Sequence, residues 1–521
     1  MTRKILFITI TTMSVTVVAL GVLILLQLQG SGEPVYDDDY YTYEENTEPT
    51  AMPTPTPSPP DEPDEIPVYN TTKDPEVYEH EDPLTLLVDP RIQWHIPPTW
   101  DFDQVFPFVE GMAGVEYIEG DGDDWHTIHT LGYMNIYGEI VIPIEHIHHA
   151  FMYAYTGAPP FSEGLVAIRS EEHLATGVFD TSGNQVVPFE NDFGWSFSEG
   201  LMAVRRGGHE WYAFSMWGEV PHWGFIDTQG NVVIPFEFDH ATDFSYGRAA
   251  VMRDGHWGFI DRTGEVIIPF IYGGPHDYGH GYHVLAPEFH EELAVVSTGG
   301  NVQNEDGSWV DTTRFGFIDI YGNEITPFIF TRAGNFSSGL AVVRLGEQQR
   351  DAYGNWYSDI RWGAIDATGN IAVPFYFRWI GHFYDGLAVA QFLDSRYHVV
   401  IDTHGEVVFS TNQFNNIYGQ QEGRMIVQAS TQDHNITVRG TGFIDARGNL
   451  VVPPVYSNVR PFSQGFAAVN AGSWVDDRWG FIDLYGNIAV PLIFEDALSF
   501  SEGFAWVRHN GLWGILRINE D

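Results

Sequence analysis

WGFIDTQGNVVIPF occupies Trp223–Phe236, and the chain repeats this phrase with small changes along much of its length. WGFIDRTGEVIIPF follows at Trp257–Phe270, and WGFIDLYGNIAVPL occurs at Trp479–Leu492. Further copies occupy Phe315–Phe328, Trp362–Phe375 and Thr441–Pro454, and degenerate copies occupy Leu131–Pro143, Gly177–Pro188 and Val399–Phe409. Self-similarity of this kind indicates one supersecondary unit that is used many times, so the repeat decides the fold class.

Each copy carries the signals of a β-hairpin. Along Trp223–Asp227 the side chains alternate between two faces, which is typical of a strand. Asp227 and Gly230 predict a tight turn, because the carboxylate can accept a bond from a backbone N–H two residues on and glycine tolerates positive φ. The β-branched stretch Val232–Ile234 predicts the returning strand, and Pro235 ends its ladder because proline has no N–H to donate.

A second motif follows each hairpin. It reads FSEGLVAI from Phe161, FSEGLMAV from Phe197, FSSGLAVV from Phe336, FSQGFAAV from Phe462 and FSEGFAWV from Phe500. The motif predicts a third strand after its glycine, and turns such as Asp254-Gly255 join that strand to the next WGFID. We therefore expect each unit to be a three-stranded meander of roughly 34 residues or more.

These residues resemble the WG-repeat (KWG-type) family, which is named for the Trp-Gly pair that opens each copy. The resemblance covers about Phe102–Leu516 and implies a β-rich tandem-repeat domain. It implies no activity, because the family is defined by its structure. Two departures stand out: Asn135 replaces the aspartate of the first copy, and Val399–Phe409 lacks both the Trp-Gly pair and the proline. We interpret the degenerate interior copy as a bend or a gap between subdomains.

The number of units bears on how they assemble. The turn aspartate recurs at Asp180, Asp227, Asp261, Asp319, Asp366, Asp402, Asp445 and Asp483. Propellers usually close with 4–8 blades, and the nine or ten units of this chain therefore favour an all-β, open, twisted, solenoid-like array. One or two closed, propeller-like sets are the alternative, because half-units at Phe102–Val115 and Trp513–Leu516 could complete one another. Since the aspartates recur at one offset, we interpret them as structural turn residues and not as catalytic acids.

The N-terminal segment predicts a single-pass membrane anchor. Residues 5–28 carry no charge and are long enough, as a helix, to cross a hydrocarbon core of about 30 Å. Arg3 and Lys4 precede this segment and acidic residues follow it, so we expect residues 1–4 inside the cell and the repeat domain outside. A cleaved signal peptide, which would leave a secreted protein, is the alternative.

Residues 29–82 predict a disordered acidic linker between this anchor and the repeat domain at 83–521. Glu33–Asp82 contains 16 acidic residues against the single Lys73, and Pro53–Pro60 reads PTPTPSPP. A segment of this composition buries too little apolar surface to offset its chain entropy. The proline run and the repulsion between like charges extend it, as in a stalk.

Composition excludes several classes of function. The formal net charge of −47 argues against nucleic-acid binding, which needs clustered Lys and Arg to neutralise phosphates. Cysteine is absent, which excludes disulfides, thiolate metal sites and a cysteine nucleophile. An exported chain without cysteine is typical of a bacterial surface protein.

Four insertions at one position of the repeat form the candidate binding site. They lie between the FSEG strand and the next WGFID, at Arg205–His222, Ser297–Arg314, Leu345–Arg361 and Asn470–Arg478. Their tryptophans are Trp211, Trp217, Trp309, Trp356 and Trp474. Loops from one offset of a regular array emerge along one edge, and tryptophans with nearby carboxylates suit sugar rings, peptides or a cationic protein surface. The alternative is that these tryptophans pack on their own scaffold.

Histidine clusters are weaker candidates for a metal site. His146 and His148 share one face of an expected strand, and His276, His280 and His283 lie in a long insertion. The chain has no H-E-x-x-H spacing, no nucleophile elbow, no P-loop and no dinucleotide fingerprint. We therefore predict neither a bound metal nor a cofactor.

The sequence thus favours a non-enzymatic binding or scaffold protein that holds a protein, peptide or glycan of the cell envelope. A structural spacer or sensor ectodomain without a small ligand is the first alternative. A glycan hydrolase that works through acidic loop residues is the second, because such enzymes carry no local motif.

Overall fold

The structure, a computed structural model, describes residues 89–119, 128–148, 158–170, 173–207, 222–273, 286–303, 309–350, 356–395, 397–411, 414–433, 436–472 and 478–519. All of these residues belong to the unit Pro63–Asp521. Their regular secondary structure consists of β-strands, without a helix. Within the described ranges, therefore, nothing helical has the length and hydrophobicity that crossing a bilayer requires. The expected anchor at 5–28 and linker at 29–82 lie outside these ranges.

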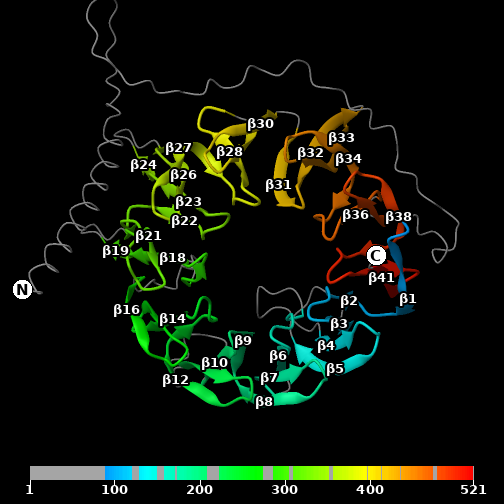
Figure 1. Cartoon of the computed structure of the whole chain (residues 1–521), viewed down its shortest axis with the longest axis horizontal. Helices are drawn as coiled ribbons and strands as arrows, with labels where there is room; N and C mark the ends of the chain where they lie inside the picture. The colour runs from blue at the N-terminus through cyan, green and yellow to red at the C-terminus, as the bar shows by residue number, and fades with distance from the viewer. Residues whose placement is uncertain are drawn as a thin grey trace, which may run out of the picture. The chain divides into compact units, whose positions relative to one another are not determined.

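The described strands form nine sheets of three or more strands and two separate two-stranded hairpins. One of the nine sheets has seven strands and contains two copies of the repeat, so the nine sheets carry ten units. Figure 1 shows the units following one another around a ring. We number them 1 to 10 in chain order.

The strands of the first five units are antiparallel and neighbour one another in chain order. Unit 1 contains β2 (Gln104–Val105), β3 (Met112–Glu119), β4 (Ile128–Asn135) and β5 (Ile140–His148). Unit 2 contains β6 (Leu165–Ser170), β7 (Ala175–Asp180) and β8 (Gln185–Asn191). Unit 3 contains β9 (Phe193–Ser198), β10 (Leu201–Arg206), β11 (His222–Asp227) and β12 (Val232–Phe238). Unit 4 contains β13 (His240–Ala241), β14 (Ala249–Arg253), β15 (His256–Ile260) and β16 (Val266–Tyr272), and unit 5 contains β17 (Phe289–His290), β18 (Leu293–Thr298) and β21 (Arg314–Asp319).

The remaining units follow the same plan. Unit 6 contains β22 (Arg332–Ala333), β23 (Leu340–Leu345), β26 (Arg361–Asp366) and β27 (Ile371–Ile380), and unit 7 contains β28 (Leu387–Phe392), β29 (His398–Asp402) and β30 (Val407–Thr411). Unit 8 contains β31 (Asn416–Gln421), β32 (Arg424–Asp433), β33 (Ile436–Asp445) and β34 (Leu450–Tyr456). Unit 9 contains β35 (Asn458–Val459), β36 (Phe466–Asn470), β37 (Trp479–Asp483) and β38 (Ile488–Phe494). Unit 10 contains β39 (Asp496–Ala497), β40 (Phe504–His509), β41 (Leu512–Ile518) and, from the start of the described chain, β1 (Ile92–Trp100).

Unit 3 illustrates the plan of one repeat. The FSEG motif turns the chain from β9 into β10, an insertion leads into β11, which is the HWGFID strand, and the Asp227 turn leads into β12. Figure 1 places β9 nearer the centre of the ring than β12. The expected three-stranded meander is therefore present, and most units add a short inner strand to it, two residues long in several of them.

Only glycine fits at the second position of the Trp-Gly pair, because the outer strand of the same unit passes close to it. The pairing of β11 with β12 is irregular around Gly224, where Trp223 faces Phe238 but Phe225 faces Ile234. A Cβ on Gly224 would lie 2.7 Å from the carbonyl oxygen of Ile234. The equivalent contact recurs at 2.7 Å for Gly258 and at 2.5 Å for Gly480. The bulged outer strand crosses too close for any side chain, so every well-formed copy keeps glycine here.

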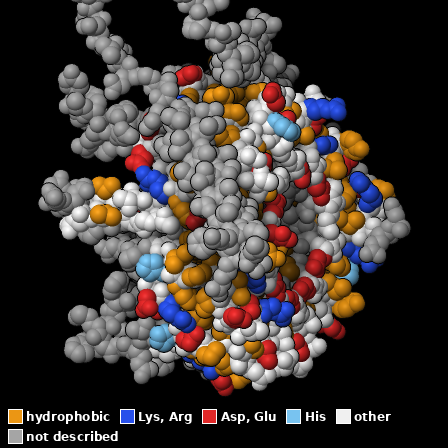
Figure 2. Space-filling model, turned by 60° about the vertical axis from the view of Figure 1, so that its left-hand side comes forward, with side chains coloured by type: hydrophobic (Ala, Val, Ile, Leu, Met, Phe, Trp, Pro, Cys, Tyr) orange, Lys and Arg blue, Asp and Glu red, His pale blue; other side chains and the backbone are white. Residues whose placement is uncertain are grey.

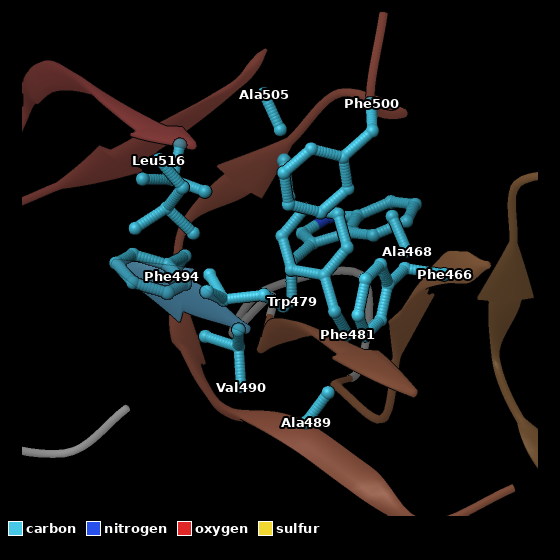
Figure 3. Close-up of a cluster of buried hydrophobic side chains, with 13 residues drawn as sticks. Phe466, Ala468, Trp479, Phe481, Ala489, Val490, Phe494, Phe500, Ala505 and Leu516 are labelled. Atoms are coloured by element: carbon cyan, nitrogen blue, oxygen red, sulfur yellow. The ribbon is translucent and has the colours of Figure 1, made fainter. Parts of the chain in front are cut away.

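The hydrophobic core is divided into clusters that lie between neighbouring units. Figure 3 shows one such cluster, in which Phe466 and Phe481 of unit 9 meet Phe500 of the next unit. The rings of Phe481 and Phe500 have their centroids 5.0 Å apart. Because each sheet buries apolar side chains against its neighbours, a single repeat has no complete core of its own.

Each of the described sheets is open and has two edges. This agrees with the expected repeat array. The two ends of the array nevertheless meet: β1 pairs with β41, and residues of unit 1, among them Phe102 and Phe108, share a hydrophobic cluster with Trp506 and Trp513 of unit 10. Two of the sequence expectations need correction here.

The half-units Phe102–Val115 and Trp513–Leu516 do not complete one sheet, because the strand that completes unit 10 is β1, which precedes the first recognisable motif. The degenerate copy at Val399–Phe409 marks no gap. Its strands β29 and β30 continue the seven-stranded sheet, because the long strand β27 pairs with β26 on one side and with β28 on the other.

Candidate ligand-binding face

The repeated turns and the insertions lie at opposite ends of each sheet. Both repeated turns, FSEG and the aspartate turn, lie at one end of each sheet, which we call the turn end. The connections between the FSEG strand and the WGFID strand leave from the opposite end, which we call the insertion end. Hydrogen bonds between the FSEG turns of several neighbouring units hold the turn ends on one side of the ring, so the insertion ends also share one side.

The turn aspartates are occupied by contacts within their own turns. Asp180 accepts hydrogen bonds from the backbone N–H groups of Ser182 and Asn184, at 2.9 and 2.8 Å, and from the side chain of Asn184. The hydrogen bonds from Asn184 lower the pKa of Asp180 below its usual value, and the Ser182 N–H adds to this. Bonds from the N–H groups two and four residues on also reach Asp227, Asp261, Asp319, Asp366, Asp402, Asp445 and Asp483, and Asn135 in the first unit.

The serine and glutamate of FSEG join neighbouring units, a role that sequence analysis missed. The carboxylate of Glu110 accepts bonds from the N–H groups of Glu163 and Gly164 in the next unit, at 2.9 and 2.7 Å. Ser162 donates its hydroxyl proton to the carbonyl oxygen of Phe197 in the unit after that, at 2.8 Å. The sequence signal for this role is that both residues recur from unit to unit, although the turn itself requires neither serine nor glutamate.

Two of the four insertions have hairpins within the described residues. The insertion of unit 5 contains β19 (Asn301–Gln303) and β20 (Trp309–Asp311), and that of unit 6 contains β24 (Gln348–Arg350) and β25 (Trp356–Ser358). Trp309 pairs with Gln303, and Trp356 pairs with Arg350. The structure thus places these two tryptophans of the candidate binding site in separate hairpins of neighbouring units. Trp211, Trp217 and Trp474 lie outside the described residues.

The bases of these two hairpins are joined. Arg314, at the start of β21 in unit 5, forms an ion pair with Glu347, which lies near the start of the insertion of unit 6. The N–H of Glu347 also donates to Asp359 at 2.6 Å, which ties together the two arms of that insertion. In the neighbouring hairpin, Val302 and Val310 face each other across the strands while remaining 52% and 43% exposed. The hairpin therefore presents apolar surface to solvent.

The histidine clusters, the weaker candidates for a metal site, fall only partly within the described residues. His146 and His148 lie on β5, where their backbones pair with Leu131 and His129. His276, His280 and His283 fall outside the described residues. Among the residues that the structure does describe, no group of three or more histidine, aspartate or glutamate side chains is arranged to hold a metal ion.

A small cavity lies between units 4 and 5, lined by Trp257, Tyr272, Ser297 and Phe315 among others. Its volume of about 10 Å³ is room for roughly one water molecule. This cavity is therefore too small to hold a ligand larger than water. Figure 2 shows acidic and basic side chains intermingled with apolar patches on the face that it presents.

One partly buried carboxyl group departs from the repeat pattern. Asp243 precedes the phenylalanine of the unit 4 turn motif, a position held by Ser196 in unit 3 and by Glu288 in unit 5. Its Oδ1 atom is buried and has no hydrogen-bond partner among the residues that the structure describes. Burial raises the pKa of Asp243 to about 7, and the charge of Glu288 adds to the effect. A carboxyl group that titrates near neutrality beside a second carboxylate could act as a proton donor.

Comparison with known proteins finds one family. The "WG containing repeat" family matches residues 177–208, 223–255, 257–282, 315–348, 362–397, 442–473 and 479–513. No protein with a curated description matches the chain.

Three solved structures to which the chain is similar have low scores. The acylaminoacyl peptidase of Pyrococcus horikoshii has 11% identity and a TM-score of 0.28, with 73% of this chain and 57% of that chain covered. The virginiamycin B lyase of Staphylococcus aureus has 11% identity and a TM-score of 0.21, with 54% and 94% covered. The V. cholerae biofilm matrix protein Bap1 has 10% identity and a TM-score of 0.24, with 82% and 89% covered.

The chain thus spans little more than half of that peptidase, and scores this low carry no argument about function. The family assignment rests instead on the repeat itself. Seven matched copies run across residues 177–513, and the described copies share the glycine under the outer strand and the aspartate of the turn. The chain therefore belongs to the WG-repeat family.

Proposed function

We propose that this protein is a membrane-anchored, extracytoplasmic binding or scaffold protein, and that its repeat domain holds a protein, peptide or glycan of the cell envelope at the insertion end. One observation carries the proposal: the insertions, including the hairpins β19–β20 and β24–β25, leave the sheets at the same end. A frame of packed sheets with its variable loops on one side is a common design for ligand recognition.

The contacts of the recurrent residues support a binding role. The turn aspartates are engaged in their turns, and the FSEG glutamates Glu110, Glu163 and Glu199 are engaged with the next unit. These carboxylates therefore stabilise the repeat structure. What varies from unit to unit is the length and composition of the insertions, and variation of this kind on a constant frame is where specificity resides.

The test is a binding measurement with the full chain, solubilised in detergent, against envelope fractions and a panel of glycans. We expect saturable binding that weakens at least roughly tenfold when Trp309 and Trp356 are both replaced by alanine, because aromatic platforms dominate such interfaces. The matched control replaces Tyr321 and Tyr485, which are 69% and 78% exposed at the turn end, by alanine. Equal losses in both double variants would contradict a ligand at the insertion end.

Anchoring and orientation are tested separately. We expect the N-terminal segment 5–28 to remain on the mature protein and residues 83–521 to be digested by protease added to intact cells. Mass spectrometry of the purified protein reports the first point, and immunoblotting of treated cells reports the second. A mature N-terminus beyond residue 28 would favour the secreted form.

Glycan hydrolysis is the second candidate, and the pair Asp243 and Glu288 is the observation that favours it. Hydrolases use two carboxyl groups, one of which has a raised pKa and protonates the leaving group. Asp243 has the raised pKa, and Glu288 is the neighbouring charge. Release of reducing ends from a glycan panel by the wild type, and its loss in Asp243→Asn, would establish this alternative. Binding without turnover would leave the scaffold role.

A further inference from the structure

The insertion end of unit 6 carries two arginines that face each other. Arg332 on β22 lies directly opposite Arg344 on β23. Residues directly opposite in an antiparallel pair have their side chains on the same face, and like charges in that arrangement destabilise the sheet. No other described unit places two basic residues at this position: the pair is Gln104 with Glu116 in unit 1 and Asn458 with Asn470 in unit 9.

Unit 10 shows the arrangement that the sheet itself would favour. There Asp496 lies opposite Arg508, so the same two positions carry opposite charges. Unit 6 keeps the arginine of the FSEG strand, Arg344, and has Arg332 where unit 10 has the aspartate. In a chain with 24 basic and 71 acidic residues, an unneutralised arginine pair is an exception that the fold does not explain.

The surroundings leave one of these guanidinium groups available. Arg344 is half-buried and donates through Nε to the hydroxyl of Thr331 at 3.0 Å. Arg332 is exposed and has no hydrogen bond or ion pair within the described part of the chain. The nearby carboxylate of Glu347 is paired with Arg314 of the neighbouring unit. Burial lowers the pKa of Arg344, and the charge of Arg332 lowers it further while Glu347 opposes the change, as expected if the two guanidinium groups repel each other.

The position of the pair connects it to the proposed binding face. Arg344 is also opposite Trp362 on β26, so the two arginines and a partly buried tryptophan follow one another across the sheet. The inserted hairpin that carries Trp356 begins four residues after Arg344, at Gln348. Cationic and aromatic groups therefore lie together at the base of the inserted hairpin β24–β25.

We propose that Arg332 and Arg344 bind an oxyanion group, such as a carboxylate or a sulfate or phosphate ester, on the ligand held at the insertion end. Guanidinium groups present their donors in a fixed fork that matches such anions, and the bound anion would relieve the repulsion between them. The inference rests on the proposed function in placing the ligand at this end, and it adds the chemical class of one ligand group.

The variant Arg332→Asp tests the proposal, because it recreates the Asp–Arg pair of unit 10 and should fold at least as stably as the wild type. Binding of the full chain is measured by calorimetry with three probes: an oligogalacturonate, a sulfated oligosaccharide and an uncharged oligosaccharide of equal length. We expect the wild type to bind at least one of the anionic probes, and Arg332→Asp to bind it about tenfold or more weakly.

The matched control is Arg253→Asp, which makes the same charge change at the insertion end of unit 4, where Arg253 pairs with Glu237. The affinity of Arg253→Asp for the anionic probe should differ from that of the wild type by less than about twofold. The exposed ion pair with Glu237 that this variant loses is weak. Preference for the carboxylated or the sulfated probe identifies the anion. The proposal is overturned if neither anionic probe binds, or if Arg332→Asp binds as the wild type does. Loss of uncharged-probe binding in Trp309→Ala/Trp356→Ala, with no anion dependence, would retain the binding face and reject the anion site.

Discussion

The carboxylate of Glu502, in the last unit, accepts a hydrogen bond of 2.7 Å from the backbone N–H of Gly111 in the first. It accepts a second bond, also of 2.7 Å, from the N–H of Glu110. This is the contact that Glu110 itself makes with the turn of unit 2. The hydroxyl of Ser501 likewise donates to the carbonyl oxygen of Phe108, as Ser162 does to Phe197. The junction between the last and first units therefore uses the same bonds as the junctions between units that are consecutive in the chain.

Replacing Glu502 by alanine should lower the free energy of unfolding by about 1–2 kcal/mol, because two backbone N–H groups lose a charged acceptor. Glu502→Gln should retain most of the stability, since Gln464 already fills this role and accepts the N–H of Gly503 at 2.8 Å. Thermal or urea unfolding of the two variants beside the wild type is the measurement. Equal destabilisation by alanine and glutamine would show that a carbonyl-type hydrogen-bond acceptor at this position does not stabilise the protein.

Gly224→Ala should destabilise the protein by roughly 2–4 kcal/mol, because the new Cβ would lie 2.7 Å from a backbone oxygen that cannot move alone. The matched control is Gly334→Ala, where the nearest atom to the new Cβ lies at 3.6 Å, an ordinary contact. We expect that control to unfold within about 0.5 kcal/mol of the wild type. Chemical denaturation of both variants decides the matter, and similar curves would contradict the close approach of the outer strand.

The strand β1 should contribute to stability as the outer strand of unit 10. Ile92 is only 3% exposed and belongs to the cluster shown in Figure 3, so Ile92→Ala should cost about 2–4 kcal/mol. Val232 sits on the outer strand of unit 3 but is 46% exposed, and Val232→Ala should cost much less. Unfolding midpoints provide the comparison. An unchanged midpoint for Ile92→Ala would mean that β1 is dispensable for closing the array.

The protein should lose stability as the pH rises from about 4 to 7 through Asp243. Burial, with the charge of Glu288, raises the pKa of this carboxyl from 3.8 to about 7. Over this interval the folded state keeps a proton that the unfolded state has released, so the free energy of unfolding falls with increasing pH. Asp243→Asn should remove this dependence, which amounts to up to about 4 kcal/mol.

Asp180→Asn is the control for that experiment. Hydrogen bonds from Asn184 lower the pKa of Asp180, so the contribution of this carboxylate to the free energy of unfolding changes only at acidic pH, below the usual pKa of an aspartate. The first unit already has asparagine, Asn135, at this position. Unfolding is followed in urea at several pH values between 4 and 8. Parallel stability profiles for the wild type and Asp243→Asn would rule out a protonated Asp243 in the folded state.

Much of the local structure could be predicted because it depends on residues close together in the chain. The alternation of WGFID, the Asp–Gly turn and the proline after the returning strand each act within a few residues, and the hairpins lie where the repeats indicated them. The loss of the Trp-Gly pair and of the proline at Val399–Phe409 predicts a bend or a gap between subdomains, and the structure shows no gap there. A seven-stranded sheet runs through that region, because the pairing of β27 with β28 compensates for what the motif lacks.

By itself, the sequence determined the repeated unit, its all-β class and the position at which insertions leave it, since these follow from periodicity and turn chemistry. Only the tertiary structure decided that β1 completes unit 10, that Glu502 reaches Gly111, and that Arg332 lies opposite Arg344. Each of these contacts joins residues through sheet pairing or the meeting of distant units. Spacing along the chain does not encode such neighbours, because they depend on how the packed sheets are arranged around the ring.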